Sequence, residues 1–251
     1  MQQSLTVFFP AYNDAPTIPG LVARAFQVLE SRAQDYEVIV INDGSQDDTG
    51  KVLQALAAQY GPHLKIVTHE VNLGYGQALR SGFAAATKDL VFYTDGDGQY
   101  DVGELPMLLE CLTPSTGLVN GYKLERNDPW HRIWIGNAYN AFAKALFRVR
   151  LRDIDCDFRL IRREVLEDLQ LTSTSGTICV ELVARIEKTG CGIKEVGVHH
   201  YPRLHGKSQF FRLRSLAGTF SQLLNLWVRL FIFVQQQPAE ARARAAASSR
   251  P

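Results

Sequence analysis

Short apolar runs alternate with segments of helical periodicity through the first half of the chain. Strands are predicted at four runs rich in β-branched and aromatic residues: 6–9, 37–41, 65–68 and 90–94. Helices are predicted where apolar residues recur every three or four positions: 21–29, 49–60, 76–86 and 105–112. We expect the first strand to stop at Pro10. This rhythm predicts an α/β fold with a doubly wound, mostly parallel sheet, helices on both faces and right-handed crossovers.

The rhythm weakens beyond residue 121. The pattern there predicts helices at 130–147 and 178–186 and strands at 158–161 and 193–198. Three parts are predicted along the chain: a folded domain over 1–210, an amphipathic helix over 211–234, and a tail over 235–251. The tail is rich in Gln, Ala, Ser and Arg, and this composition predicts disorder.

The composition limits the kind of protein this can be. The 251 residues are 46% hydrophobic, and 27 Lys and Arg oppose 26 Asp and Glu, for a formal charge of +1. A wholly disordered or collagen-like chain is excluded, and the charge argues against nucleic acid as a partner. The four cysteines form no CxxC pair, which predicts reduced, mostly buried thiols in a cytosolic protein rather than a zinc ribbon. Residues 1–5 do not resemble a secretory signal.

The last apolar stretch, residues 216–234, is interrupted by polar residues and does not predict a confident transmembrane helix. Residues 203–214 (RLHGKSQFFRLR) precede it and interleave cations with aromatic residues. An amphipathic helix that packs on the domain, on a membrane or on a membrane partner explains this pattern. The preceding cations favour the membrane or partner alternatives, because cations attract an anionic bilayer surface.

Polar clusters directly follow the strands of the first half. They are Tyr12-Asn13-Asp14, Asn42-Asp43-Gly44-Ser45, Asn72-Leu73-Gly74 and Asp95-Gly96-Asp97. Ligands of open α/β sheets bind outside the carboxyl ends of the strands. All four clusters fall on that edge, which predicts the binding face.

Asp95 and Asp97 are the candidate metal ligands. Residues two apart in an extended segment point the same way, so both carboxylates can reach one cation. Two carboxylates together with diphosphate oxygens and water suit Mg²⁺ or Mn²⁺. The alternative interpretation is a solvated Asp/Gly turn.

Two further turns have both a binding and a structural interpretation. Asp43 can accept hydrogen bonds from a base or ribose, while Asp47, Asp48 and Thr49 are expected to cap the helix that follows. The Gly-rich loop from residue 72 to 78 can present amides to an anion, or it can serve tight packing of its helix.

Several familiar motifs are absent. No GxGxxG follows the first strand, and neither HExxH nor GxSxG occurs. Gly206-Lys207-Ser208 resembles the end of a P-loop, but Tyr201 stands where its first Gly is required. Of His199 and His200, at most one is expected to enter a site, since neighbouring strand residues point to opposite faces.

The ordered set of motifs is far more specific than any one of them. The pieces are Phe9-Pro10-Ala11-Tyr12-Asn13-Asp14, Val40-Ile41-Asn42-Asp43-Gly44-Ser45 with Asp47 and Thr49, Asn72-Leu73-Gly74 and Asp95-Gly96-Asp97-Gly98-Gln99. Over roughly residues 5–210 this set resembles glycosyltransferase family 2, which has the GT-A fold. Within that family the chain is most similar to the dolichyl-phosphate mannosyltransferase and polyprenyl-phosphate glycosyltransferase branch. Its later markers are Gly121-Tyr122-Lys123 with Arg126, Asp155-Cys156-Asp157-Phe158-Arg159 and Arg203-Leu204-His205-Gly206-Lys207-Ser208.

The resemblance implies a role for each matching position. The implied donor-binding residues are Pro10, Tyr12, Asp14, Asp43, Asp95, Gly96, Lys123 and Arg126. The implied ligands of Mg²⁺ or Mn²⁺ are Asp95, Asp97 and Gln99. The implied acceptor-binding residues are Arg203, Lys207, Ser208, Asp155 and Asp157. The implied catalytic residues are Asp95, Asp97, Arg203 and Lys207. Asp14, Lys123 and Asp157 depart from the residues that many relatives carry, which leaves the donor sugar and its base, GDP- or UDP-linked, open.

The resemblance implies an inverting, metal-dependent enzyme that moves a sugar from a nucleotide donor to a polyprenyl phosphate at the cytosolic membrane face. A lipid phosphate is already anionic, so its attack needs no strong general base. If the acceptor is a sugar hydroxyl instead, Asp155 or Asp157 is the candidate base. The alternatives are a family 2 enzyme with a saccharide or other non-phosphate acceptor and a non-catalytic nucleotide-sugar-binding subunit. A pyrophosphorylase is disfavoured, because residues 9–14 do not resemble its Gly-rich loop.

Overall fold

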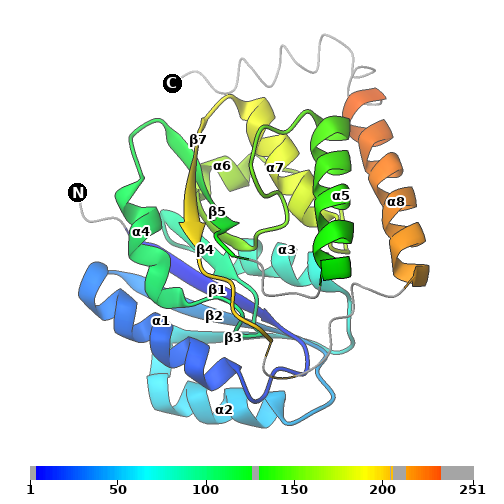
Figure 1. Cartoon of the computed structure of the whole chain (residues 1–251). Helices are drawn as coiled ribbons and strands as arrows, with labels where there is room; N and C mark the ends of the chain where they lie inside the picture. The colour runs from blue at the N-terminus through cyan, green and yellow to red at the C-terminus, as the bar shows by residue number, and fades with distance from the viewer. Residues whose placement is uncertain (1–3, 126–129, 204, 206–212, 233–251) are drawn as a thin grey trace, which may run out of the picture. The chain divides into compact units, whose positions relative to one another are not determined.

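The computed structural model describes residues 4–125, 130–203, 205 and 213–232 (Figure 1). By internal contacts the chain divides into two compact units, Met1–Gln209 and Phe210–Pro251. Each unit is described by itself. The predicted tail at 235–251 lies outside the described residues, and its disorder stays a prediction.

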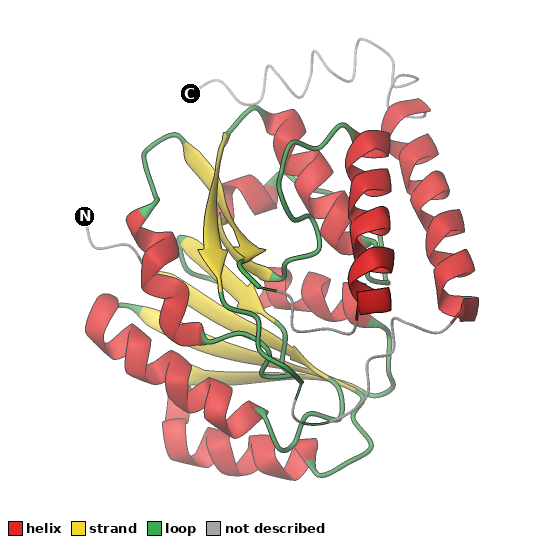
Figure 2. Ribbon diagram, in the orientation of Figure 1, coloured by secondary structure: helices red, strands yellow, loops and turns green. Residues whose placement is uncertain are grey.

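The first unit alternates strands and helices, as the apolar pattern predicts (Figure 2). Its strands are β1 (Leu5–Ala11), β2 (Tyr36–Asp43), β3 (Leu64–His69), β4 (Leu90–Thr94), β5 (Thr116–Lys123), β6 (Phe158–Arg162) and β7 (Gly192–Val198). Its α-helices are α1 (Ile18–Arg32), α2 (Thr49–Tyr60), α3 (Tyr75–Ala85), α4 (Leu105–Glu110), α5 (Trp130–Phe147), α6 (Arg163–Glu167) and α7 (Ile178–Thr189). Short 3₁₀ turns lie at Gly61–His63 and Val102–Glu104. The sequence pattern predicts neither β5 nor the single turn α6.

In the described part of the chain the strands form one seven-stranded sheet in the order β3-β2-β1-β4-β6-β5-β7. β1 runs parallel to β2 and β4, β2 to β3, and β5 to β7. β6 is antiparallel to both of its neighbours, β4 and β5. The predicted α/β fold with a mostly parallel sheet is confirmed.

Alternate residues of β1 face opposite sides of the sheet, so helices cover both. Val7 and Phe9 belong to one buried cluster with the apolar face of α1, which includes Val22 and Leu29. Phe8 points to the other side, where its ring meets the ring of Phe83 on α3 edge to face, with centroids 5.2 Å apart. Burial on both faces explains why the central strands are nearly continuous apolar runs.

The expected stop at Pro10 is wrong, because β1 continues to Ala11. Pro10 pairs with Ile41 and Ala11 with Asn42 in the ladder to β2. On the other side the ladder to β4 has already ended at Phe8. A residue without an N–H is tolerated there because no strand bond to β4 is lost.

The four cysteines are free thiols. Cys156 and Cys179 are buried, whereas Cys111 and Cys191 are half-buried. The prediction of unpaired thiols therefore agrees with the structure, but only two of the four are fully buried.

The second unit consists, in its described part, of α8 (Leu213–Trp227) and a π-helical turn (Val228–Ile232). The rings of Trp227 and Phe231 stack with centroids 5.8 Å apart across the start of that turn. Among the described helices, none combines the length and the apolar character that crossing a membrane would require. What the helix contacts, membrane or partner, stays a prediction.

Candidate active site

Strands β2, β1 and β4 are neighbours in the sheet and run in the same direction. Their carboxyl ends therefore lie side by side, as the arrowheads in Figure 1 show for β1 and β2. The polar turns that begin at Tyr12, Gly44 and Asp95 meet at this edge. The predicted binding face is thus where the sheet brings these turns together.

The turns after β1 and β2 are joined by hydrogen bonds. Asn13 adopts a left-handed backbone conformation, with φ 58°. Its side-chain oxygen accepts hydrogen bonds from the amides of Gln46 (2.8 Å) and Asp47 (3.3 Å), and its own amide donates to Ser45 Oγ (3.0 Å). Asp47 accepts from the amide of Thr49 (2.9 Å), the first residue of α2, whereas the N-cap residue Asp48 makes no side-chain capping hydrogen bond. Hydrogen bonds thus join the two turns into one wall beside the sheet edge.

Asp14 lies on this wall next to the turn after β4. Its carboxylate accepts a hydrogen bond from the amide of Tyr12 at 2.9 Å. A Cβ atom on Gly96 would lie 2.4 Å from the carbonyl oxygen of Pro10 and 3.4 Å from Asp14 Oδ2, so glycine is required there. Burial raises the pKa of Asp14 to about 6, with a further contribution from the charge of Asp97. Asp14 and Gly96 therefore face the same small space.

Asp43 holds the loop after β3. Its two oxygens accept hydrogen bonds from the amides of Leu73 (2.9 Å) and Gly74 (3.0 Å). Oδ1 also lies 2.6 Å from His69 Nδ1, and Nε2 of that ring lies 2.9 Å from Ser81 Oγ on α3. Both carboxylate oxygens of Asp43 therefore already have hydrogen-bond partners. Its direct contact with a nucleotide stays a prediction and would require an exchange of partners.

The Gly-rich loop packs tightly instead of presenting its amide to solvent. The amide of Gly76 donates to the carbonyl oxygen of Thr174 at 2.9 Å. A Cβ atom at Gly76 would lie 2.6 Å from the backbone of residues Ser173 and Thr174. Of the two interpretations of this glycine, the structure supports packing, because its N–H is already used.

Asp95 follows β4 directly and accepts a hydrogen bond from the hydroxyl group of Tyr75 at 2.6 Å. Burial raises its pKa well above the ordinary value, and the charges of Asp157 and Asp97 raise it further. Among the described residues, this is the one side chain that donates a hydrogen bond to Asp95. The carboxylate is therefore poorly compensated within the protein.

Asp97 is buried and faces a different set of partners. Its Oδ1 accepts from the amide of Gln99 at 3.0 Å, and its Oδ2 forms an ion pair with the guanidinium of Arg203. Burial raises the pKa of Asp97, and the charge of Arg203 acts in the opposite direction. Gln99 Oε1 lies 3.4 Å from Arg203 Nε, so the predicted metal ligands Asp97 and Gln99 both contact this arginine.

Lys123, at the end of β5, reaches the loop before β6. Its Nζ donates to the carbonyl oxygen of Asp155 at 2.8 Å and lies 3.8 Å from a carboxylate oxygen of Asp153. Burial raises the pKa of Asp155 to about 6, against the charge of Lys123 and together with the charge of Asp157. The predicted donor-side Lys123 and acceptor-side Asp155 are thus neighbours.

Asp157 belongs to a buried polar network behind the site. Its Oδ1 accepts from the hydroxyl of Tyr93 (3.2 Å) and the thiol of Cys179 (3.1 Å), and lies 3.4 Å from Arg159 Nη1. The fully buried Arg159 also donates to Asn120 Oδ1 at 2.7 Å and to Tyr93 Oη at 2.6 Å. These contacts assign Asp157 a structural position, and its role toward an acceptor stays a prediction.

Other predicted positions fall elsewhere. Arg126, Lys207 and Ser208 lie outside the described residues. His199 pairs with Glu104 on an exposed surface, and the ring of His200 packs against Tyr100 with centroids 5.1 Å apart. Both histidine side chains therefore contact residues that follow the acidic turn, Tyr100 and Glu104.

Sequence reasoning named Arg159 within a motif but gave it no role, and it overlooked two other residues that shape the site, Tyr75 and His69. Tyr75 donates to Asp95, Arg159 neutralises the network behind it, and His69 braces Asp43. A structural role for Arg159 could have been suspected, because it stands between the apolar residues Phe158 and Leu160 of a predicted strand. Nothing in the local pattern points to Tyr75 or His69, since their partners come from other elements.

The acidic turn fits a hard divalent cation by the chemistry of its donors. Asp95, Asp97 and Gln99 offer carboxylate and amide oxygens, which Mg²⁺ and Mn²⁺ prefer. The pKa of Asp95 is raised first by burial and then by the charges of Asp157 and Asp97, and a bound cation would oppose both effects. Within the described part of the chain, no three His, Cys, Asp or Glu side chains form a complete cation site by themselves. Remaining ligands would have to come from a substrate or water.

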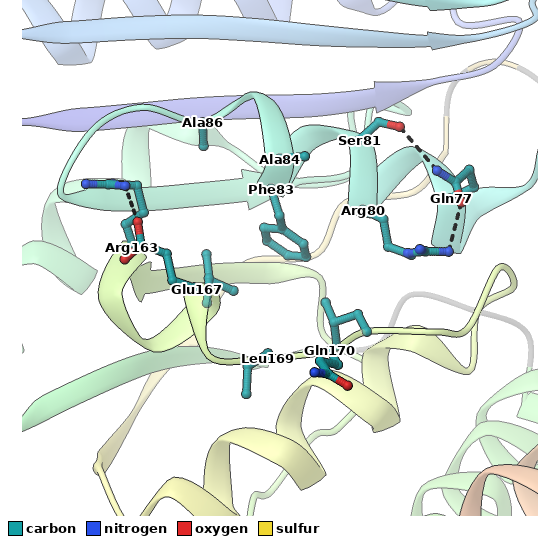
Figure 3. Close-up of a pocket in the computed structure, with 12 residues that line it drawn as sticks. Gln77, Arg80, Ser81, Phe83, Ala84, Ala86, Arg163, Glu167, Leu169 and Gln170 are labelled. Atoms are coloured by element: carbon teal, nitrogen blue, oxygen red, sulfur yellow. Dashed lines mark hydrogen bonds and ion pairs between the residues drawn. The ribbon is translucent and has the colours of Figure 1, made fainter. Parts of the chain in front are cut away.

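A hollow of about 530 Å³ opens elsewhere, between α3 and the segment around α6 (Figure 3). Arg80, Ser81 and Phe83 line one wall, and Arg163 and Leu169 lie across from them. None of the predicted site residues lines this hollow. The candidate active site therefore rests on the geometry of the strand ends, which the hollow does not include.

Comparison with known proteins finds matches over the part of the chain that carries these turns. Residues 6–170 match the family model described as glycosyl transferase family 2. The chain is 29% identical over 206 residues to the undecaprenyl-phosphate 4-deoxy-4-formamido-L-arabinose transferase of Aeromonas hydrophila, covering 82% of this chain and 62% of that protein. It is 28% identical to the Pseudomonas aeruginosa protein of the same name, covering 84% of this chain and 62% of that one. The chain thus spans less than two thirds of the length of these two relatives.

Among solved structures, glucosyl-3-phosphoglycerate synthase from Mycobacterium tuberculosis has the same fold. Its complex with Mn²⁺, uridine diphosphate and phosphoglyceric acid gives a TM-score of 0.69 at 19% identity, covering 90% of this chain and 78% of that one. A complex of that synthase with Mg²⁺ and uridine diphosphate gives a TM-score of 0.65. At this level of identity the likeness concerns the fold.

Proposed function

Because this chain belongs to glycosyl transferase family 2, we propose that it moves a sugar from a nucleotide-sugar donor to a polyprenyl phosphate. The reaction is inverting and depends on Mg²⁺ or Mn²⁺. The observation that carries the proposal is the Asp95–Asp97 turn at the carboxyl end of β4, beside the turns after β1 and β2. The curated relatives that are named undecaprenyl-phosphate transferases support the choice of acceptor. The Mn²⁺ and uridine diphosphate complexes of the structural neighbour support a cation and a nucleotide donor.

The chemistry follows from the charges. The acceptor phosphate oxygen attacks the anomeric carbon, the bond from that carbon to the diphosphate oxygen breaks, and the configuration inverts. A bound Mg²⁺ or Mn²⁺ supplies positive charge to the departing diphosphate. Asp95, Asp97 and Gln99 would hold this cation, and Asp14, which lies beside Gly96, would contact the nucleoside. Because nucleophile and leaving group are both anions, no proton has to move and no strong base is needed.

A second acceptor class is favoured by one observation. Asp155 has a pKa raised to about 6 by burial, which suits a general base near neutral pH. With a sugar hydroxyl as acceptor, Asp155 would take the hydroxyl proton as that oxygen attacks. A lipid phosphate has no such proton to lose, so the two acceptor classes differ in their need for Asp155.

We also propose that the protein works at the cytosolic face of a membrane, held peripherally. The cations of residues 203–214 and the apolar, aromatic residues that follow support this, because such a segment binds an anionic surface. Sedimentation with vesicles that contain anionic lipid tests it. Equal recovery with neutral and anionic vesicles would count against the proposal.

The test of function combines purified protein, UDP- and GDP-linked sugars, Mn²⁺ or Mg²⁺, and a short polyprenyl phosphate. Lipid-linked sugar should form, and Asp97→Ala should abolish it. Asp48→Ala is the matched control, because Asp48 is exposed just before α2, makes no side-chain capping bond and pairs with Lys51. Product on a saccharide with none on lipid would move the assignment to the second acceptor class. Donor binding without turnover on any acceptor would favour a non-catalytic subunit.

A further inference from the structure

The segment after β7 is fixed on the acidic turn by its backbone. The amide of Tyr201 donates to the carbonyl oxygen of Gln99 at 2.8 Å. In return, Gln99 Nε2 donates to the carbonyl oxygen of Tyr201 at 2.9 Å. The amide of His199 donates to Glu104 at 2.9 Å and fixes the start of the same segment. Arg203 is therefore presented to the turn from a defined position.

Arg203 contacts two of the three proposed cation ligands. One terminal nitrogen of its guanidinium pairs with Asp97 Oδ2, and its Nε lies 3.4 Å from Gln99 Oε1. The side chain of Asp97 is 9% exposed and that of Arg203 is 30% exposed, so the pair is shielded from most of the solvent. A positive charge already lies on the oxygens that a divalent cation would use.

We propose that Arg203 is a built-in competitor of the divalent cation, a role that rests on the proposed function and deepens it. Without a nucleotide, the guanidinium neutralises Asp97 and lowers the affinity of the turn for metal alone. A donor diphosphate offers Arg203 a better partner, since a guanidinium binds phosphate oxygens with paired hydrogen bonds. Arg203 then leaves Asp97 for the diphosphate and frees the carboxylate. Metal and nucleotide therefore bind together.

The size of the effect follows from how often Arg203 occupies the turn. If metal binds only to the form in which Arg203 has left Asp97, the apparent dissociation constant for metal equals the intrinsic constant divided by the fraction of that form. An arginine seated on Asp97 about nine tenths of the time weakens metal binding about tenfold. Removal of the Arg203 side chain should therefore strengthen metal binding about tenfold.

The test measures binding of Mn²⁺ alone to the full chain, with free Mn²⁺ followed by electron paramagnetic resonance. Arg203→Ala should bind Mn²⁺ about tenfold more tightly than the wild type, and Arg203→Lys should lie nearer the wild type. Arg24→Ala is the matched control, because Arg24 also pairs with an aspartate, Asp101, at 3.2 Å outside the site. It should leave Mn²⁺ affinity unchanged. Equal or weaker binding by Arg203→Ala would overturn the proposal.

A second arm adds UDP or GDP at saturating concentration. The advantage of Arg203→Ala should then disappear or reverse, because the wild-type arginine now contributes to diphosphate binding. An advantage that persists unchanged would overturn the exchange of partners. If Arg203→Ala fails to fold, Arg203→Gln replaces it with the same two outcomes. Absence of sugar transfer by wild type would refute the proposed function, but it would leave the Mn²⁺ comparison valid.

Discussion

Carboxylates at the two ends of the central sheet have opposite surroundings. Glu37, on β2, accepts hydrogen bonds from Lys65, Thr6 and Thr87. Burial would raise its pKa, but these donors outweigh burial and lower it. Asp95, after β4, accepts from Tyr75 and lies near other carboxylates, and burial raises its pKa well above the ordinary value. The supply of donors separates a carboxylate that holds the fold from one that remains available to a ligand.

The same contrast recurs in the half of the sheet around β5, β6 and β7. Glu181, on α7, is fully buried and accepts from the amides of Thr172 and Ser173 and from Arg185. Despite its burial, these bonds lower its pKa. For Asp155, burial dominates and raises the pKa to about 6. The direction of the pKa shift thus depends less on position along the strands than on the donors that surround each carboxyl group.

The largest effect is expected at Asp95, the carboxylate with few hydrogen-bond donors. Asp95→Asn should reduce sugar transfer by about 10³-fold, because a charged cation ligand is lost. The free energy of unfolding at pH 7.5 should not fall, since a poorly compensated negative charge is removed. Rates of lipid-linked sugar formation and denaturant unfolding measure both. Retention of more than a tenth of the activity would contradict the assignment.

Glu37, the carboxylate with several hydrogen-bond donors, should affect stability instead. Glu37→Ala should lower the free energy of unfolding by about 3 kcal/mol, because it leaves the buried donor Thr6 without its acceptor. Lys65→Met is the comparison and should cost less than Glu37→Ala, because Lys65 is 47% exposed and Thr6 and Thr87 still donate to Glu37. Denaturant unfolding of both variants decides. A change below 1 kcal/mol for Glu37→Ala would break the comparison.

The pH dependence of stability has opposite signs for carboxylates with a raised pKa and for those with a lowered pKa. The pKa of Asp155 is about 6 when folded, against an ordinary value of 3.8. Between about pH 4 and 6 the folded protein therefore keeps a proton that the unfolded chain has released, and stability falls as the pH rises. Asp155→Asn should remove up to about 2–3 kcal/mol of this fall in metal-free buffer. An unchanged slope would contradict the burial of this carboxyl group.

Asp47→Asn supplies the opposite control. Burial opposes ionisation of Asp47, but hydrogen bonds from Thr49 and Ala15 together outweigh it and lower the pKa. The stability that this carboxylate contributes is therefore present above its ordinary pKa and is lost as the pH falls through the folded value. The variant should be less stable than wild type at neutral pH, and the difference should shrink in acid.

The smallest effect is expected at Tyr75. Tyr75→Phe removes the hydroxyl that orients Asp95 and should weaken Mn²⁺ binding in the presence of nucleotide by about tenfold, as for other groups that orient metal ligands. Isothermal titration measures the affinity. Tyr36→Phe, on β2, controls for the loss of a hydroxyl. Affinity equal to wild type would remove Tyr75 from the site.

Much of this architecture could be predicted because it depends on local patterns. The runs of β-branched residues at β2 and β4 and the polar turns after them place the binding face without long-range information. The strand β6 was predicted at 158–161, but its antiparallel direction and the whole of β5 were not, since strand direction depends on long-range pairing. The ion pair between Arg203 and Asp97 joins residues 106 apart in sequence, so no local pattern reveals it.

The pair of carboxylates after β4 is the centre of this account. A crystal soaked with Mn²⁺ and a nucleoside diphosphate tests it most directly, through anomalous difference density for manganese. We predict one peak within bonding distance of Asp95 and Asp97 that also contacts the diphosphate, with Arg203 moved off Asp97. A peak elsewhere, or a diphosphate bound away from both carboxylates, would contradict the account.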